Sequence, residues 1–186
     1  YWNVDPGGRR AEAFGLWVLH GERGDAREVV GVSLIASLPT DGPRVELEAR
    51  LHNDGARCFR VRAQFPTDAQ TSVATADGHF EAVERAIDTW SGWTNPSNCQ
   101  PCLDFVDVSD ATGGVCVANR GLPEYEVLRD GRNTIAITLL RAVDRIGDWG
   151  DFPTPDAQCD GENVAEYAII VHTGGLTESG ADLEAR

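Results

Sequence analysis

Apolar and polar residues alternate along much of the chain with the two-residue period of a half-buried β-strand. In residues 44–53 the apolar positions fall on one face and the charged positions on the other, and residues 58–65 repeat this pattern. The sequence Asn53-Asp54-Gly55 lies between the two runs, and these residue types tolerate the positive φ of a tight reversal. The pattern therefore predicts an antiparallel hairpin of two strands, each with one charged face in solvent.

Seven further segments have the composition of strands and are separated by turn-forming residues. They are residues 29–38, 79–87, 103–108, 115–119, 124–128, 134–143 and 164–173. No segment of helical length shows a helical period, so the expected fold is all-β, an antiparallel β-sandwich of roughly nine strands. Residues 88–101 and 144–161 are predicted to be two long loops, and loops of that length are usually functional or interfacial.

The length of 186 residues fits one domain, and we expect residues 1–186 to form a single β-sandwich. Because the chain opens on Tyr1-Trp2 without an initiator Met, we expect it to be a piece of a longer polypeptide. Residues 174–186 are polar and acidic, and they are expected to be either a disordered end or the truncated edge of a larger protein.

Acidic residues outnumber basic ones by 30 to 16, which gives a net charge of −14, and every basic residue is Arg. A nucleic-acid partner or an anionic membrane surface would require a clustered basic surface, so both are excluded as partners. No run approaches the ~20 apolar residues of a membrane span. The 5 cysteines, an odd number, favour a reducing compartment and hence a cytoplasmic protein over a disulfide scaffold.

Cys99-Gln100-Pro101-Cys102 has the spacing of a redox pair or of half a zinc site. A structural zinc ion needs four ligands, however, and no second cysteine or histidine pair follows at short spacing. The βαβ context of a thioredoxin-like site is also missing. Cys99 and Cys102 are therefore weak metal candidates, and two loop cysteines without a chemical role are the simpler interpretation.

Two pairs of residues are of the types that occur in carbohydrate sites. Trp90 and Trp93 can stack on the C–H face of a sugar, or they can cover the core or an interface with a neighbouring domain. Glu124 and Glu126 are two apart on a predicted strand, which sets them ~7 Å apart, near the carboxylate spacing of inverting glycosidases. Any solvent-exposed strand face shows the same pattern, and nothing raises the pKa of one partner, so we interpret the two acids as non-catalytic.

Residues 59–168 resemble the C-terminal β-sandwich region of bacterial glycoside hydrolase family 38, the α-mannosidases. An ordered set of short motifs carries the resemblance. They are RVRAQFPT at 60–67, FEAVER at 80–85, FVDVSD at 105–110, NRGLPEYEV at 119–127, ITLLR at 137–141 and TPDAQC at 154–159.

The resemblance implies a three-part enzyme with a β/α barrel, a helical middle and this sandwich. It implies retaining hydrolysis of α-mannosides, with the zinc ligands and the nucleophilic Asp in the barrel. No segment of this chain matches those motifs, so no catalytic residue is expected here and no cofactor, and the zinc is expected in the absent catalytic domain. The expected partners are that domain of the same chain and an α-mannoside, and an exposed docking face would allow a homo-oligomer.

Residues 120–126 form the tight corner that is the best candidate for a part reaching the substrate entrance. Arg120, Glu124 and Tyr125 are the substrate-rim candidates, because the guanidinium fork of an Arg suits sugar hydroxyls. The alternative is that Arg120 pairs with Glu124 or Glu126 and braces the turn.

Three functions follow from these observations. The first is an accessory domain of an α-mannosidase, inactive alone, that packs on the catalytic barrel and shapes the substrate entrance. The second is a stand-alone carbohydrate-binding module that uses Trp90 and Trp93. The third is a zinc or redox domain that uses Cys99 and Cys102.

Overall fold

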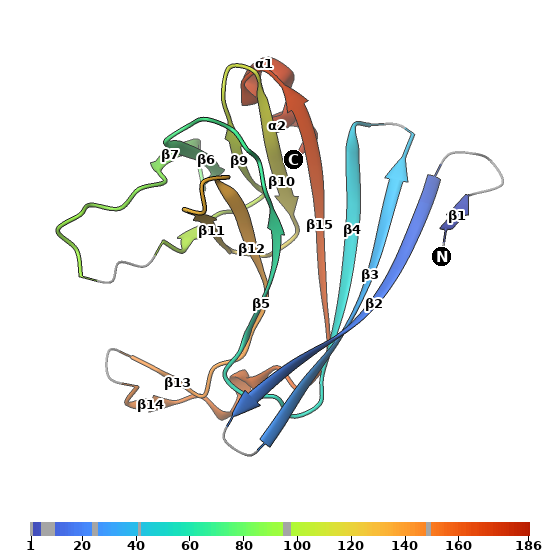
Figure 1. The fold of residues 1–186 in the computed structure, drawn as a ribbon, viewed down its shortest axis with the longest axis vertical. Helices are drawn as coiled ribbons and strands as arrows, with labels where there is room; N and C mark the ends of the chain where they lie inside the picture. The colour runs from blue at the N-terminus through green and yellow to red at the C-terminus, as the bar shows by residue number, and fades with distance from the viewer. Residues whose placement is uncertain (1, 5–9, 24–25, 41, 95–97, 148–149) are drawn as a thin grey trace.

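The computed structural model describes residues 2–4, 10–23, 26–40, 42–94, 98–147 and 150–186. Within these ranges antiparallel pairing joins the strands into a nine-stranded sheet, a four-stranded sheet and a two-stranded hairpin. Figure 1 shows how the strands of the two larger sheets are arranged. These two sheets share one hydrophobic core. The all-β antiparallel sandwich expected from the sequence is confirmed.

The large sheet has the strand order β1-β2-β3-β4-β15-β10-β9-β6-β7. Its strands are β1 (Trp2–Val4), β2 (Arg10–Arg23), β3 (Ala26–Pro39), β4 (Arg44–Asn53), β6 (Val73–Asp77), β7 (Ala82–Ala86), β9 (Phe105–Ser109), β10 (Gly113–Asn119) and β15 (Gly161–Thr173). Strand β15 lies between β4 and β10, so the last strand of the chain joins the early strands to the middle ones.

The small sheet has the order β5-β12-β11-β8. Its strands are β5 (Arg60–Phe65), β8 (Gln100–Pro101), β11 (Glu124–Leu128) and β12 (Thr134–Arg141). The remaining elements are the hairpin of β13 (Arg145–Ile146) and β14 (Phe152–Pro153), the 3-10 helix η1 (Pro155–Gln158), and the helices α1 (Leu176–Ser179) and α2 (Ala181–Glu184). The second predicted long loop, residues 144–161, therefore contains regular structure.

The core between the sheets is built from the apolar side of each alternating strand. Its most buried side chains include Leu51, Val106 and Val117 from the large sheet and Tyr125, Ile135 and Ile137 from the small one. Full burial of one such side chain stabilises the fold by about 1.5–3 kcal/mol. The opposite positions on β5 and β11 are polar, as the alternation predicts.

The predicted hairpin of residues 44–53 and 58–65 is wrong in its pairing, although both strands form. Strand β4 pairs with β3 and β15, whereas β5 pairs with β12 in the other sheet. The side chain of Asn53 accepts a hydrogen bond from the Ala56 N–H and donates to the carbonyl oxygens of Ala56 and Gln158. These bonds lead the chain away from β4 and across to the small sheet.

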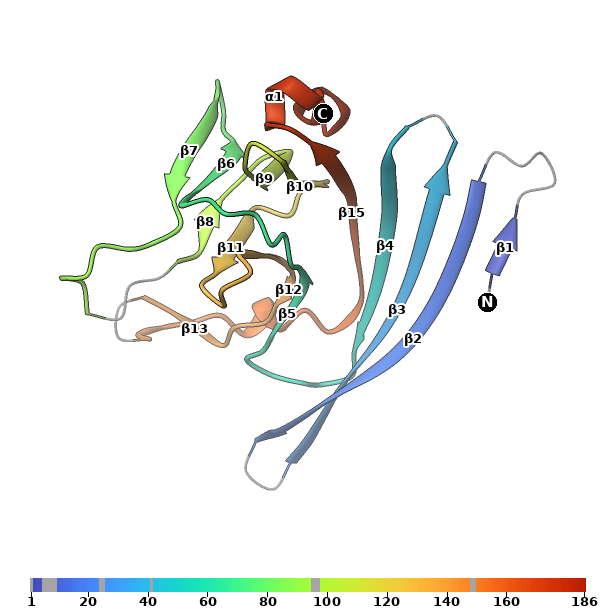
Figure 2. The ribbon, with the colours of Figure 1, turned by 45° about the horizontal axis from the view of Figure 1, so that its top comes forward.

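Strand β2 does not follow from the sequence pattern, because its apolar residues are consecutive and do not alternate. They form what we call the apolar arm: Phe14, Leu16, Trp17, Val18 and Leu19, all of them exposed. Strand β1 covers the outer edge of β2 only at residues 11–13, and residues 14–23 have no other strand on that edge in the described ranges. Figures 1 and 2 show β1, β2 and β3 extending past the small sheet.

Residues 174–186 form the two short helices α1 and α2, which lie against the outer face of the large sheet. Ala181 is buried there in a cluster with Phe105, Cys116 and Ile170. The Arg186 guanidinium donates a 2.6 Å hydrogen bond to Asp77. In the described ranges no helix is long and apolar enough to cross a membrane.

Candidate functional site: the arginine cavity

Glu124, the first residue of β11, is held at the end of the small sheet by groups from two other strands. Alternation directs Tyr125 into the core and Glu124 to the outer face. The antiparallel register places Arg60, at the start of β5, opposite Arg141, at the end of β12. Long cationic side chains therefore come from two neighbouring strand ends towards one carboxylate.

The Glu124 carboxylate accepts three side-chain hydrogen bonds. Oε1 accepts from Thr138 Oγ1 at 2.7 Å and from Arg60 Nη1 at 3.1 Å, and Oε2 accepts from Arg141 Nη1 at 3.1 Å. Burial alone would raise the pKa of Glu124, but the bonds from Thr138 and Arg60 and the charges of Arg141 and Arg60 outweigh it and lower this pKa. Glu124 is therefore an anionic acceptor at neutral pH and does not suit the role of a general acid.

The neighbouring acid is held in the same way, because Arg62 of β5 donates to Glu126. Both acids of β11 are thus partners of arginines on the outer face of the small sheet. The interpretation of Glu124 and Glu126 as non-catalytic residues stays a prediction.

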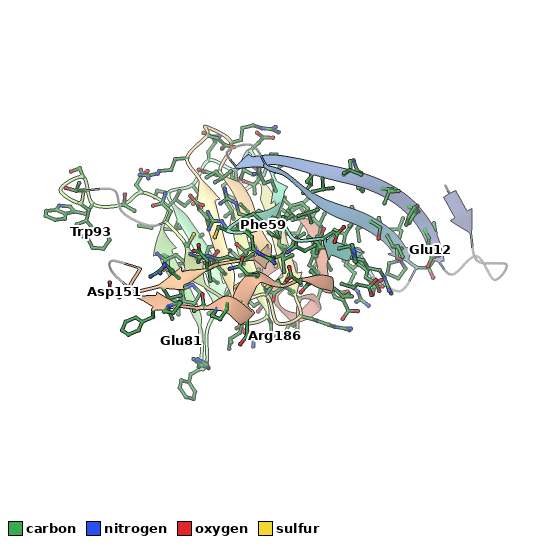
Figure 3. All side chains as sticks on the ribbon, turned by 90° about the horizontal axis from the view of Figure 1, so that it is seen from below. Glu12, Phe59, Glu81, Trp93, Asp151 and Arg186 are labelled. Atoms are coloured by element: carbon green, nitrogen blue, oxygen red, sulfur yellow. The ribbon has the colours of Figure 1, made fainter. Side chains whose placement is uncertain are left out.

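The end of the small sheet is hollowed into a cavity of about 530 Å³, which we call the arginine cavity. It is lined by Cys58, Phe59, Arg60, Cys99, Glu124 and residues 141–145. Figure 3 views the molecule from this end and labels Phe59. Sequence reasoning identified Glu124 but missed Arg60 and Arg141, which lie near the ends of predicted strands, and Arg145, which lies in the predicted loop of residues 144–161.

The other two rim candidates lie elsewhere. The Arg120 side chain is 81% exposed, and its carboxylate partner is Glu166 at 3.6 Å, so it does not brace the turn through Glu124 or Glu126. Tyr125 is 2% exposed, its hydroxyl accepts from Arg85 at 3.3 Å, and burial raises its pKa. Of the three candidates, Glu124 lines the arginine cavity.

Trp90 and Trp93 lie in a turn closed by a 3.1 Å hydrogen bond from the Trp93 N–H to the Trp90 carbonyl oxygen. They are 70% and 61% exposed, so neither covers the core of this chain. Figure 3 shows Trp93 projecting far from the sheets. The adjoining residues 95–97 lie outside the described residues.

Cys99 and Cys102 lie in different environments. The Cys99 sulfur accepts a 3.1 Å hydrogen bond from Arg60 at the cavity, whereas Cys102 is buried in the core with its Sγ 3.5 Å from the Leu122 carbonyl oxygen. Burial raises the pKa of Cys102 to about 11. In the part of the chain that the structure describes, no three His, Cys, Asp or Glu side chains gather as a metal site, so this donor set does not fit a zinc ion.

A buried polar pair lies on the outer face of the large sheet, under the C-terminal helices. His172 Nε2 is 2.8 Å from Asp107 Oδ2, and Ser109 donates a 2.6 Å hydrogen bond to Oδ1 of the same carboxylate. The Nδ1 atom of His172 lies 3.1 Å from the Gly174 carbonyl oxygen. The sequence gives no local signal for this pair, because Asp107 is 65 residues from His172 along the chain.

Three relatives resemble the chain over most of its length. A protein of Halalkalibacterium halodurans with the provisional name mannosylglycerate hydrolase is 33% identical over 162 residues, which are 87% of this chain and 18% of that protein. The solved structure of an alpha-mannosidase from Enterococcus faecalis V583 has a TM-score of 0.83 and 29% identity, over 95% of this chain and 22% of that one. A second structure, of a protein in the glycosyl hydrolase family 38 from Enterococcus faecalis, has a TM-score of 0.79 and 28% identity, with coverage of 95% and 22%.

The chain spans about a fifth of the length of these relatives. The family model described as the glycosyl hydrolases family 38 C-terminal domain matches residues 18–156, which is more than half of the chain. The motifs at residues 60–67 and 119–127 lie inside that match, and the matched range includes strands of both larger sheets. The chain therefore belongs to the family of C-terminal domains of glycosyl hydrolases family 38.

Proposed function

We propose that this chain is the accessory β-sandwich of a longer enzyme that hydrolyses α-mannosides with retention of configuration. The greater length of the relatives supports a catalytic domain in the same polypeptide. In this proposal the nucleophile and the zinc ion belong to that domain, and the residues of this chain take no chemical step. The name of the Halalkalibacterium halodurans relative supports glycerate, a small carboxylic acid, as the group joined to mannose in the substrate.

The observation that carries the proposal is the apolar arm. Leu16 is 69% exposed, and the neighbouring Trp17, whose side chain points to the other face of the strand, is 50% exposed. A soluble domain rarely leaves both faces and one edge of an apolar strand open to solvent, since such a strand invites pairing and aggregation. We assign the arm to the interface with the rest of the same polypeptide.

The arginine cavity supports the second part of the proposed role, which is to shape the substrate entrance. Its guanidinium groups and the Glu124 carboxylate present donors and an acceptor for sugar hydroxyls. Among the rim candidates we therefore place Glu124 at the entrance. Sugar stacking on Trp90 and Trp93 stays a prediction.

Light scattering combined with size-exclusion chromatography tests the role of the arm. With no catalytic domain present, we expect the chain to self-associate as its concentration rises. The double variant Leu16→Glu, Val18→Glu should be monomeric at the same concentrations, because it places two charges on one face of the arm. Val171→Glu is the matched control, since Val171 is an exposed strand residue of the same sheet outside the arm.

A wild-type chain that stays monomeric at every concentration would contradict the assignment of the arm. Activity gives a separate test, because the purified chain should not release the phenol from an aryl α-mannoside. If the purified chain does release it, the chemistry does not belong to another domain.

A further inference from the structure

The arginine cavity carries an excess of positive charge in a strongly acidic protein. Three arginines, Arg60, Arg141 and Arg145, and two acidic residues, Glu124 and Asp144, are among the residues that line it. Three cations against two anions leave one positive charge, whereas the chain as a whole carries −14. The net charge of the cavity is therefore opposite in sign to the net charge of the whole chain.

The hydrogen bonds inside the cavity leave donors available. Arg60 and Arg141 each use Nη1 on Glu124, and in the described residues their Nε and Nη2 atoms have no hydrogen-bond partner. Arg145 donates through Nη1 to the Gly150 carbonyl oxygen at 2.8 Å and has no carboxylate within ion-pair distance in those residues. Among the three arginines of the cavity, Arg145 is thus the one without a carboxylate partner in the described residues.

A site that has one net positive charge and guanidinium N–H groups available to donate favours the binding of an oxyanion. Arginine binds a carboxylate through two parallel N–H···O bonds, which are stronger than bonds between neutral groups. One net positive charge matches a carboxylate, whereas a phosphate monoester carries nearly two negative charges at neutral pH. The volume of about 530 Å³ lies within the range of small-ligand pockets.

We infer that the arginine cavity binds the carboxylate of the acidic group joined to mannose in the substrate, with Arg145 as its main partner and Arg60 and Arg141 as supporting donors. The inference rests on the proposed function for the identity of the substrate. It adds a division of labour, in which this chain recognises the acid and the catalytic domain acts on the sugar. Discrimination between acidic and neutral mannosides then depends on residues of the accessory domain.

The test uses the purified chain and D-glycerate, followed through the arginine Nε–H signals in NMR titrations. Glycerate should shift the signals of Arg145, Arg60 and Arg141 in a saturable way, and glycerol, the neutral analogue, should not. Arg145→Gln should weaken glycerate binding by about tenfold, because it removes the unneutralised cation. Added NaCl should weaken binding as well, since it screens an exposed ionic contact.

Arg132→Gln is the matched control. Arg132 is an exposed arginine before β12, it pairs with Asp68, and it lies at the other end of that strand from Arg141. This variant should bind glycerate as the wild type does. Equal shifts with glycerol, no saturable shift with glycerate, or unchanged binding by Arg145→Gln would each overturn the inference.

Failure of this inference is distinguishable from failure of the proposed function. If glycerate does not bind while the arm still drives self-association, the carboxylate site is wrong and the accessory role stands. If glycerate binds through Arg145 but the purified chain cleaves an aryl α-mannoside, the site stands and the accessory role is wrong.

Discussion

Glu124 is a partly buried carboxylate whose environment favours its charged form. Its bonds to Thr138, Arg60 and Arg141 outweigh burial, so its pKa in the folded chain lies below the ordinary glutamate value. A carboxyl group with a lowered pKa stabilises the fold above its unfolded pKa of about 4.3, and this contribution is lost as the pH falls through the folded value. The stabilisation by Glu124 is therefore fully present at neutral pH and is lost only in acidic solution.

Glu124→Gln should lower the free energy of unfolding by about 1 kcal/mol at neutral pH, because it removes charge-assisted hydrogen bonds at a site partly screened by solvent. The difference from the wild type should shrink as the pH falls below about 4. Urea unfolding at neutral and acidic pH measures both values. Glu162→Gln is the control, since Glu162 is more exposed and lies 3.5 Å from its partner Arg50. A difference that does not change with pH would show that the charge of Glu124 is not its cause.

The cysteines should differ sharply in reactivity, because the thiolate is the reactive form and burial disfavours it. Burial raises the pKa of Cys102 to about 11 and raises that of Cys116 further, whereas Cys58 is exposed. Iodoacetamide should modify Cys58 in the native chain and leave Cys102 and Cys116 unmodified until denaturant is added. Mass spectrometry of tryptic peptides measures the extent at each site. If Cys116 were modified as fast as Cys58, this would contradict the burial of Cys116 in the cluster with Phe105, Ile170 and Ala181.

At the scale of elements, alternation predicts several strands that bury one face, but the sequence analysis misses β2, whose apolar side chains are exposed, and β6, which buries Ala74 and Ala76. Strands β4, β5 and β11 alternate and form where expected. Strand β2 bears consecutive apolar residues at 16–19, so no alternation marks it, and these side chains are exposed on both faces among the described residues. A pattern that reports burial on one face cannot identify a strand whose apolar side chains are exposed on both faces.

Strand pairing is less predictable than strand formation, because the partners lie far apart in the chain. The register joins Asn53 to Gly161, and no local signal announces that pair. The candidate site shows the same limit. Glu124 was identifiable from its corner motif, but Arg60 and Arg141 approach it from positions 64 residues before and 17 residues after.

Helix α2 packs against the outer face of the large sheet, and a single substitution should disrupt this packing. Ala181 is 3% exposed against Phe105 and Ile170, so Ala181→Glu would bury an unpaired charge and cost about 2–3 kcal/mol of stability. Thermal unfolding measures the loss, and Cys116 should become open to alkylation. Leu183→Glu is the matched control on the same helix, because Leu183 is 76% exposed and its replacement should change stability by less than about 0.5 kcal/mol. Equal effects of the two variants would contradict the docking of α2.

At the scale of the whole molecule, the acidic surface opposes the compact state. Each of the 16 arginines can neutralise one of the 30 acids, and the excess acids repel one another. Exposed ion pairs such as Arg132–Asp68 are screened by solvent and contribute little to stability, so they offset little of this repulsion. The negative potential of these excess acids also disfavours the binding of anionic ligands, except at sites where arginines cluster.

Salt should therefore stabilise this protein near neutral pH. Raising NaCl from 0.01 M to 1 M shortens the Debye length from about 30 Å to about 3 Å, which removes the long-range repulsion and weakens the few exposed ion pairs. Because unpaired acids are in excess, the first effect should dominate, and Tm should rise by a few degrees. The monomeric variant Leu16→Glu, Val18→Glu should be used, so that salt-induced association does not contribute.

Near the pI of 4.5 the net charge vanishes, and the same increase in NaCl should leave Tm almost unchanged. A fall in Tm with NaCl at neutral pH would mean that the ion pairs on the sheet faces outweigh the repulsion.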